Sequence, residues 1–190
     1  MVAQSFLNLA SAFGLSTSAG LNAYIPLLVF ALGGRLFPSL VTLNEPWTPL
    51  TSWWVIGTLV VLLAVEILVD KIPAVDTVND IIQTIIRPAA GAILFAASTN
   101  AVGIHPVIAA ICGVILAGGV HAAKAGSRPA LTAATAGAGN PIVSTIEDIV
   151  SFTLSVLSVV APYLVVAVIV VALGLALWWY LRRKKRAKSC

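Results

Sequence analysis

Long apolar segments alternate with short polar ones along the whole chain. The two clearest segments run from Ser52 to Asp70 and from Pro162 to Leu181. Each has about the 20 residues that a helix needs to cross a membrane. A third segment, Leu21 to Leu36, follows the more polar stretch from Gln4 to Ser18, which predicts an amphipathic or partly broken helix ahead of this span. The pattern therefore predicts a helical membrane protein.

Three further apolar segments complete the pattern. Pro88 to Asn100 and Ile104 to His121 are separated by the turn-like stretch from Asn100 to Gly103, which predicts a helical hairpin, and Pro141 to Ala161 follows. By length, the segments predict an all-α, polytopic transmembrane bundle of about six crossings, with one or two broken or re-entrant helices. We expect a membrane domain over residues 1–161, a final transmembrane helix over 162–181 and a basic tail over 182–190.

Composition excludes an ordinary soluble domain. Hydrophobic residues make up 59% of the chain and charged residues 9%, whereas soluble domains carry about 25% charged residues. The net charge of +4 comes from a cluster of basic residues near the C-terminus: Arg182, Arg183, Lys184, Lys185, Arg186 and Lys188. A basic cluster directly after a span favours an anchor on anionic lipids over a nucleic-acid site.

The distribution of basic residues predicts the orientation, because cytoplasmic loops are enriched in Lys and Arg. With the tail inside, six crossings place four further basic residues on the cytoplasmic side: Lys71, Arg87, Lys124 and Arg128. Arg35 and the loop from Phe37 to Thr51 then lie outside. We therefore expect both termini in the cytoplasm.

The first polar cluster follows the span that ends at Asp70. Glu66 and Asp70 are four residues apart and share a helix face. Spacings of four, three and four then align a polar stripe on a short helix: Asp76, Asp80, Gln83 and Arg87. Ionisable groups at membrane depth are costly, which makes them candidates for a site. An interfacial helix that turns its polar face to water accounts equally well for this stripe.

A second polar cluster lies at the cytoplasmic end of a later span. His121, Lys124 and Arg128 share one face, and Pro129 is expected to interrupt the helix after them. The small residues from Ala130 to Asn140 predict a broken or re-entrant segment, which membranes tolerate where protein or a wet cavity satisfies the backbone.

Two adjacent carboxylates follow this segment. Ser144, Glu147 and Asp148 share a face of the helix that is expected to open at Pro141. Buried carboxylates need partners, and the basic residues nearest in sequence are Lys124, Arg128 and His121. Ion pairs between the two sets are therefore expected.

Two weaker signals remain. Asn22 and Tyr24 precede Pro26, which is expected to kink the first span and free carbonyl groups toward a cavity, although hydrogen bonding between helices explains the two polar residues as well. The spacing of Pro73, Val75, Thr77 and Asp80 recurs at Pro141, Val143, Thr145 and Asp148. Coincidence in so apolar a chain is an equal alternative to an internal repeat.

Five short motifs carry a resemblance to a known family. They are GLNAYIP at 20–26, DKIPAVD at 70–76, RPAAG at 87–91, HAAKAG at 121–126 and NPIVSTIED at 140–148. Together they resemble a bacterial integral membrane family catalogued as domain of unknown function 4126. The resemblance implies a bacterial inner-membrane protein and a shared polar site, and it supplies no activity.

The leading hypothesis is a transporter or channel-like carrier for a small cation or a proton-coupled solute. Its site comprises Asp76, Asp80, Arg87, His121, Lys124, Arg128, Asn140, Glu147 and Asp148, supported by Asn22, Tyr24, Glu66, Asp70 and Lys71. A divalent cation would be held by Asp80, Glu147, Asp148 and His121.

Two alternatives stay open. The basic residues could hold an anionic lipid or polyprenyl phosphate, or the ion pairs could only fix helix register in a non-transporting scaffold or assembly factor. Standard enzyme motifs are absent from the sequence, so we do not expect an enzyme. A chain of this size is compatible with a homo-oligomer.

Overall fold

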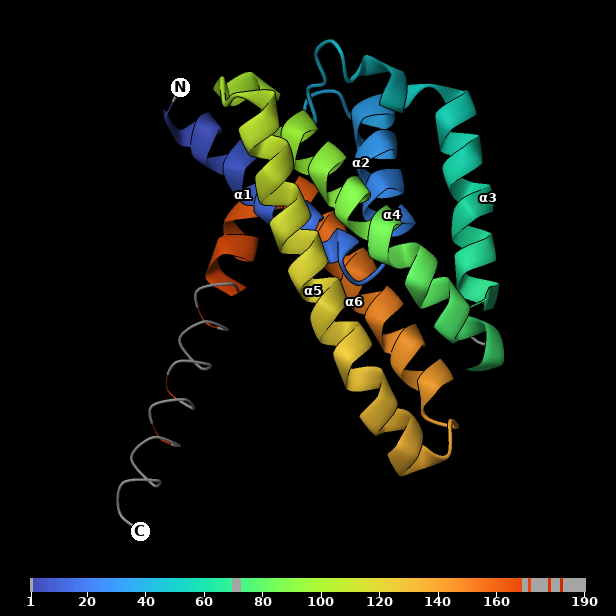
Figure 1. Ribbon diagram of the computed structural model, residues 1–190. Coiled ribbons are helices and arrows are strands. Elements are labelled where there is room, and N and C mark those ends of the chain that lie inside the picture. Colours follow the sequence, from blue (N-terminus) through green and yellow to red (C-terminus); the bar gives the residue numbers. More distant parts are fainter. Residues whose placement is uncertain (1, 70–72, 169–170, 172–177, 179–181, 183–190) are drawn as a thin grey trace.

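The chain folds into a bundle of α-helices (Figure 1). The computed structural model describes residues 2–69, 73–168, 171, 178 and 182, with the side chains of residues 2, 73–78, 80 and 101 left out. The helices are α1 (Val2–Ala19), α2 (Tyr24–Leu36), α3 (Trp53–Val69), α4 (Pro73–Thr99), α5 (Pro106–Thr135) and α6 (Asn140–Val160), with short 3-10 turns η1 (Thr48–Thr51) and η2 (Asn100–Val102). The described part contains no strand, which confirms the all-α prediction.

Three helical segments are long and apolar enough to cross a membrane: Ile81–Thr99, Pro106–Thr135 and Asn140–Val160. Tyr24–Leu36 and Trp53–Val69 are shorter apolar helices. Large hydrophobic side chains such as Trp54, Ile85 and Ile115 are exposed on the bundle, as expected of a protein whose outer surface meets lipid. The expected final helix over 162–181 falls largely outside the described residues, so the number of six crossings stays a prediction.

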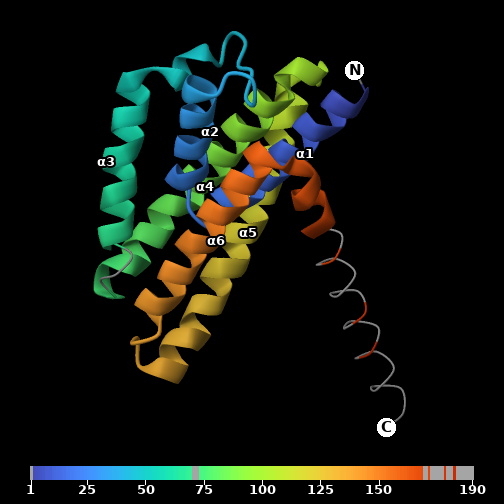
Figure 2. The same cartoon turned by 180° about the vertical axis from the view of Figure 1, so that it is seen from behind.

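Helices α1 and α2 form a hairpin that turns back inside the bundle (Figures 1 and 2). We call residues 20–23, which join them, the hairpin tip. The tip packs beside the middle of α5, where a Cβ atom on Gly20 would lie 2.5 Å from the Ala117 carbonyl oxygen. Ala117 is about 17 Å along α5 at 1.5 Å per residue. A membrane core is about 30 Å thick, so the tip lies at membrane depth when α5 begins at the membrane surface.

The hairpin changes the topology from the one expected. Sequence predicts a single crossing over Leu21 to Leu36, with the N-terminus on the side opposite the Phe37–Thr51 loop. In the structure, α1 begins at the same end of the bundle as that loop (Figure 1). The segment before Tyr24, expected to be an amphipathic or broken lead-in, is a separate helix of 18 residues.

Two prolines lie inside continuous helices. Pro88 is within α4 and Pro129 within α5, so the expected break at Pro129 and the separate amphipathic helix before Pro88 are both wrong. Neighbouring contacts hold α5 on each side of Pro129, through Arg128 before it and Thr132 after it. The chain turns only at Ala136 and Gly137, both with positive φ, so the non-helical segment is shorter than the expected Ala130–Asn140.

Close to the hairpin tip, on the side toward the Phe37–Thr51 loop, the helices approach closely through small residues. A Cβ atom on Gly113 of α5 would overlap the Gly91 carbonyl oxygen of α4. Ser16 of α1 donates to the same carbonyl at 3.0 Å. Between α1 and α6, the Ser18 hydroxyl lies 2.8 Å from that of Ser151. Small residues allow such close packing in membrane bundles.

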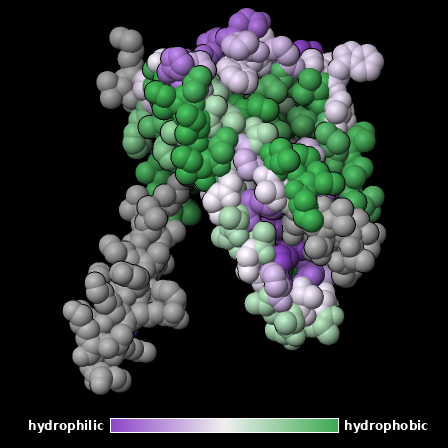
Figure 3. All heavy atoms as spheres, viewed as in Figure 1, coloured by the Kyte–Doolittle hydropathy of each residue, from purple (hydrophilic) through white to green (hydrophobic). Residues whose placement is uncertain are grey.

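Hydropathy follows this division of the bundle. Hydrophobic side chains cover much of the visible surface, and hydrophilic ones gather at the loop end and again lower down, between α4, α5 and α6 (Figure 3). The second group lies where the charged side chains of these helices converge.

Candidate functional site

A buried lysine contacts the hairpin tip. Lys124 Nζ, on α5, lies 2.9 Å from Glu147 Oε2 of α6 and donates to the Leu21 carbonyl oxygen at 3.2 Å. The lysine side chain is 2% exposed. Because α1 ends at Ala19, the carbonyl groups beyond it are not used within that helix. The Lys124 ammonium group therefore supplies a hydrogen-bond donor to a backbone carbonyl of the tip.

Glu147 joins two cations. It accepts from Arg128 Nη2 at 3.2 Å as well as from Lys124. These pairs join the C-terminal part of α5 to the N-terminal part of α6. A hydrogen bond between Thr132 and Asn140 extends this contact toward the turn at Ala136 and Gly137. We call Leu21, Asn22, Lys124, Arg128, Glu147 and Asp148 the tip network.

Asn22 connects the other side of the tip to α6. Its side-chain oxygen accepts from the backbone N–H groups of Tyr24 and Ile25, each at 3.0 Å, which caps the start of α2. Its amide nitrogen donates to Asp148 Oδ1 at 2.9 Å. One buried asparagine thus fixes both the backbone of the tip and a carboxylate.

Helix ends give the tip a defined polarity. The C-terminal end of α1 is the negative end of its dipole and the N-terminal end of α2 is the positive end of its dipole. The Lys124 ammonium group lies against the Leu21 carbonyl that follows α1. Opposite charges and dipole ends therefore meet at one place, as in membrane carriers whose discontinuous helices bind ions.

A second network lies between α3, α4 and α5. Arg87 Nη2 donates to Glu66 Oε1 at 3.1 Å, and Arg87 Nη1 contacts His121 Nδ1 at 3.0 Å. His121 Nε2 lies 3.1 Å from the Thr84 hydroxyl. The Arg87 and Glu66 side chains are 0% and 1% exposed. We call Glu66, Thr84, Arg87 and His121 the arginine network.

The arginine network fixes the tautomer of His121. A guanidinium group has donors and no acceptor, so Nδ1 must accept from Arg87 and is unprotonated in this arrangement. The ring hydrogen then lies on Nε2, which donates to Thr84. His121 is neutral here.

Tyr24 and Gln83 lie beside this network. Both are buried, and the Tyr24 hydroxyl interacts electrostatically with Glu66, Gln83 and Arg87. Because Tyr24 follows the hairpin tip and Arg87 lies one turn from Gln83, the two networks are neighbours inside the bundle.

The predicted pairing between the two sets of residues is confirmed in part. Lys124 and Arg128 both pair with Glu147, as expected. His121 contacts Arg87 and Thr84 on α4, and Asp148 accepts from Asn22. Asn140 bonds to Thr132, a residue that sequence reasoning did not single out.

Several predicted residues cannot be placed. Asp70 and Lys71 lie outside the described residues, and Asp76 and Asp80 lie on α4 with side chains that are not described. Sequence reasoning ranked Glu66 only as a supporting residue and missed Thr84 and the Leu21 carbonyl. A carbonyl at a helix break leaves no signal in side-chain composition.

The expected metal set is not tested as a whole, because the Asp80 side chain lies outside the described residues. No group of three or more His, Cys, Asp or Glu side chains in the described part of the structure could hold a metal ion. His121 on α5 contacts the guanidinium group of Arg87 on α4, and Glu147 on α6 contacts the ammonium group of Lys124 on α5.

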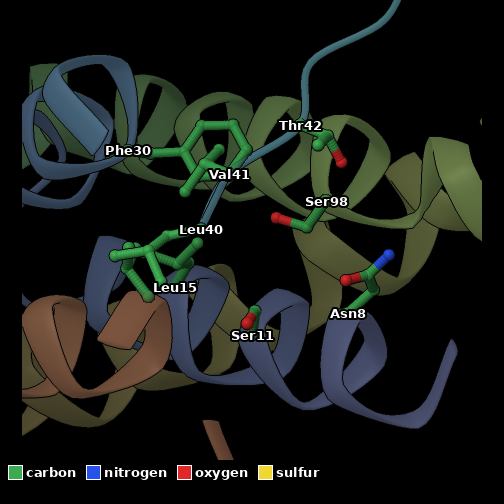
Figure 4. Close-up of a pocket in the computed structure, with 9 residues that line it drawn as sticks. Asn8, Ser11, Leu15, Phe30, Leu40, Val41, Thr42 and Ser98 are labelled. Carbon is green, nitrogen blue, oxygen red and sulfur yellow. The ribbon is translucent and has the colours of Figure 1, made fainter. Parts of the chain in front are cut away.

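Figure 4 shows a small cavity whose lining includes no residue of either network. Its volume is about 30 Å³, enough for one or two water molecules. Ser11, Asn8 and Ser98 supply polar groups to it. The Ser98 hydroxyl is buried and has no hydrogen-bond partner among the described residues.

A family model covers most of the chain. The match, to a domain of unknown function (DUF4126), spans residues 9–182. The chain belongs to this family. No curated protein and no solved structure matches it. The match includes both networks and the hairpin tip, so they lie within the family's shared region.

Proposed function

We propose that this protein is a membrane carrier for a small cation or a proton-coupled solute, with its binding site at the hairpin tip. The observation that carries the proposal is the contact of Lys124 with both the Leu21 carbonyl and Glu147. A broken helix pair, a backbone carbonyl and a buried carboxylate supply the oxygen atoms that hard cations prefer.

In this proposal, Lys124 acts as a built-in cation. Its ammonium group occupies the position between Leu21 and Glu147 while no substrate is bound. An incoming cation competes with Lys124 for the same oxygen atoms, and Asp148, held by Asn22, supplies further negative charge. Desolvation cost and Coulomb attraction nearly offset each other in buried ion pairs, which makes such an exchange energetically accessible.

The proposal includes an orientation. The α5–α6 connection follows Lys124 and Arg128, and by the positive-inside tendency this end faces the cytoplasm of a bacterial inner membrane. The N-terminus then lies on the opposite side, with the Phe37–Thr51 loop. The basic residues near the C-terminus are proposed to contact anionic lipids. We propose neither an enzymatic reaction nor nucleic-acid binding, and a homo-oligomer is compatible with the carrier.

Ligand-dependent thermal stability tests this function. The detergent-purified full chain is treated with chelator and titrated with Na⁺, K⁺, Mg²⁺, Ca²⁺ and Mn²⁺, and in parallel with anionic lipid. A ligand at 100 times its Kd stabilises by about 2.7 kcal/mol. We expect a cation-specific rise in Tm that Glu147→Gln and Asp148→Asn each remove.

Glu45→Gln is the matched control, because Glu45 is an exposed loop carboxylate that contacts Thr48. It should leave the cation response unchanged. A lipid-specific shift lost in Arg128→Gln would replace the proposal with head-group binding, and no shift with any ligand would favour a scaffold.

A further inference from the structure

The arginine network contains three ionisable groups that the proposed exchange at the hairpin tip does not use. Glu66, Arg87 and His121 come from three different helices and are all buried. His121 and Lys124 are three residues apart on α5, about one helical turn. The arginine network therefore lies next to the tip network on the same helix.

Arg87 contacts Glu66 and His121 at the same time, so its position affects both side chains. It stays charged at every physiological pH, and it donates to Glu66 and His121 through different nitrogen atoms. While Arg87 Nη1 occupies the lone pair of His121 Nδ1, no proton can bind there. The state of the histidine is therefore governed by the position of Arg87.

Arg87 also has a donor left over. Its Nε atom is buried without a hydrogen-bond partner among the described residues. A buried donor without a partner costs about 1–3 kcal/mol, so the observed position of the guanidinium group does not satisfy all of its donors. A second position can therefore compete with it.

We propose that the arginine network is a proton-binding site, in which His121 Nδ1 accepts a proton when Arg87 Nη1 withdraws from it. A proton from water forms the Nδ1–H bond, and the Nη1–H···Nδ1 hydrogen bond is lost. The imidazolium ion keeps its Nε2–H bond to Thr84. The site then holds two cations, the Arg87 guanidinium group and the His121 imidazolium ion, and the Glu66 carboxylate balances one of these charges. The proton leaves Nδ1 when Arg87 returns.

Groups on every neighbouring element bear on this step. Tyr24 lies on α2, Glu66 on α3, and Thr84, Gln83 and Arg87 on α4, and Lys124 follows on α5 itself. Glu66 favours the imidazolium ion, whereas Arg87 and Lys124 oppose it. Because Lys124 lies one helical turn from His121, movement of the Lys124 ammonium group would change the proton affinity of His121, which would couple this site to cation exchange at the tip. The inference names the coupling ion of the proposed carrier and rests on that function.

Histidine-selective ¹⁵N NMR can observe the site directly. The chain has two histidines, and His105 is exposed at the start of α5, so it serves as an internal reference. In the full chain at neutral pH, we expect His121 to be the neutral tautomer with hydrogen on Nε2. On acidification, a proton should appear on Nδ1 of His121 while the protein stays folded.

Glu66→Gln should shift this protonation to lower pH by about one unit, a tenfold loss of proton affinity, because the favourable carboxylate is gone. Glu45→Gln should leave His121 unchanged. Thr84→Val is a second variant for the case in which Glu66→Gln does not fold, and it should also lower the protonated fraction of His121.

The proposal is overturned if His121 stays unprotonated over the whole pH range of the folded protein, or if neither Glu66→Gln nor Thr84→Val changes its titration. These results are independent of substrate. If His121 titrates as expected but no cation raises Tm, the carrier is refuted and the proton site stands. If a cation raises Tm but His121 does not titrate, the proton site is refuted and the carrier stands.

Discussion

The same helices contact each other in two different ways at two levels of the bundle. On the loop side of the hairpin tip, α4 and α5 touch through Gly91 and Gly113, and Ser16 of α1 donates to the Gly91 carbonyl. Toward the hairpin tip, α5 meets its neighbours through charged groups, with His121 against Arg87 and Lys124 against Glu147.

The difference separates a part of the bundle with fixed helix contacts from a part whose ion pairs can exchange partners. Close backbone contacts have one good geometry, because any added atom overlaps its neighbour. Ion pairs offer several arrangements of similar free energy, since each charge accepts another partner of opposite sign. We therefore place the moving parts of the proposed carrier from the tip toward the α5–α6 turn, and its rigid frame on the loop side of the tip.

The largest expected effect comes from removing one partner of a buried ion pair. Glu66→Leu leaves the Arg87 guanidinium group without its carboxylate, and breaking such a pair costs about 3–5 kcal/mol. Equilibrium unfolding in mixed detergent micelles measures the change. The double variant Glu66→Leu, Arg87→Leu should recover most of the loss, because two apolar side chains need no counter-charge. A double variant as unstable as the single one would contradict this account.

Overpacking the rigid frame should cost less. Gly113→Ala places a methyl group against the Gly91 carbonyl oxygen, and overpacking typically costs about 1–3 kcal/mol. Gly119→Ala, on the same helix with open space around it, is the control and should stabilise by up to about 1 kcal/mol. Equal effects of the two variants, measured by the same unfolding assay, would show that α4 and α5 do not pack closely.

The hairpin tip depends on a single asparagine. Asn22→Ala removes the cap of α2, which costs about 0.5–2 kcal/mol, and also the bond to Asp148. Asn22→Ser retains a capping oxygen but is too short to reach Asp148, so it should lose less. Thermal unfolding compares them. If serine were as destabilising as alanine, capping would not be the main role of Asn22.

The smallest expected effect lies between α1 and α6. Ser155→Ala removes a hydroxyl that bonds to Ser18 at 2.7 Å, and hydrogen bonds between membrane helices contribute about 0.6 kcal/mol on average. Thr153→Ala is the control, because Thr153 is exposed and its hydroxyl donates to the Ile149 carbonyl of its own helix. If Ser155→Ala lowered the free energy of unfolding more than Glu66→Leu does, the order of effects expected here would be wrong.

Much of the helical pattern could be predicted from the sequence. The span expected over Ser52–Asp70 corresponds to α3, and the one over Pro141–Ala161 to α6. Apolar runs of this length have few alternatives in a membrane. The α1–α2 hairpin was missed, because whether a short apolar helix crosses or turns back depends on its neighbours.

The candidate site was predicted unevenly for a similar reason. Helical spacing placed Lys124, Arg128 and His121 on one face, and the first two do meet Glu147. Spacing within one helix does not say which neighbour each residue faces, so the contact of His121 with Arg87 was not foreseen. The break expected at Pro129 was wrong, because contacts on both sides hold α5 continuous.

Cation flux through the hairpin tip tests the central claim most directly. Proteoliposomes containing the full chain would be assayed for proton flux and for uptake of each cation in the binding panel. We predict flux in the wild type and with Glu45→Gln, and loss of flux with Glu147→Gln, a change that keeps the size of a side chain that is 15% exposed. Undiminished flux in a folded Glu147→Gln protein would contradict the account.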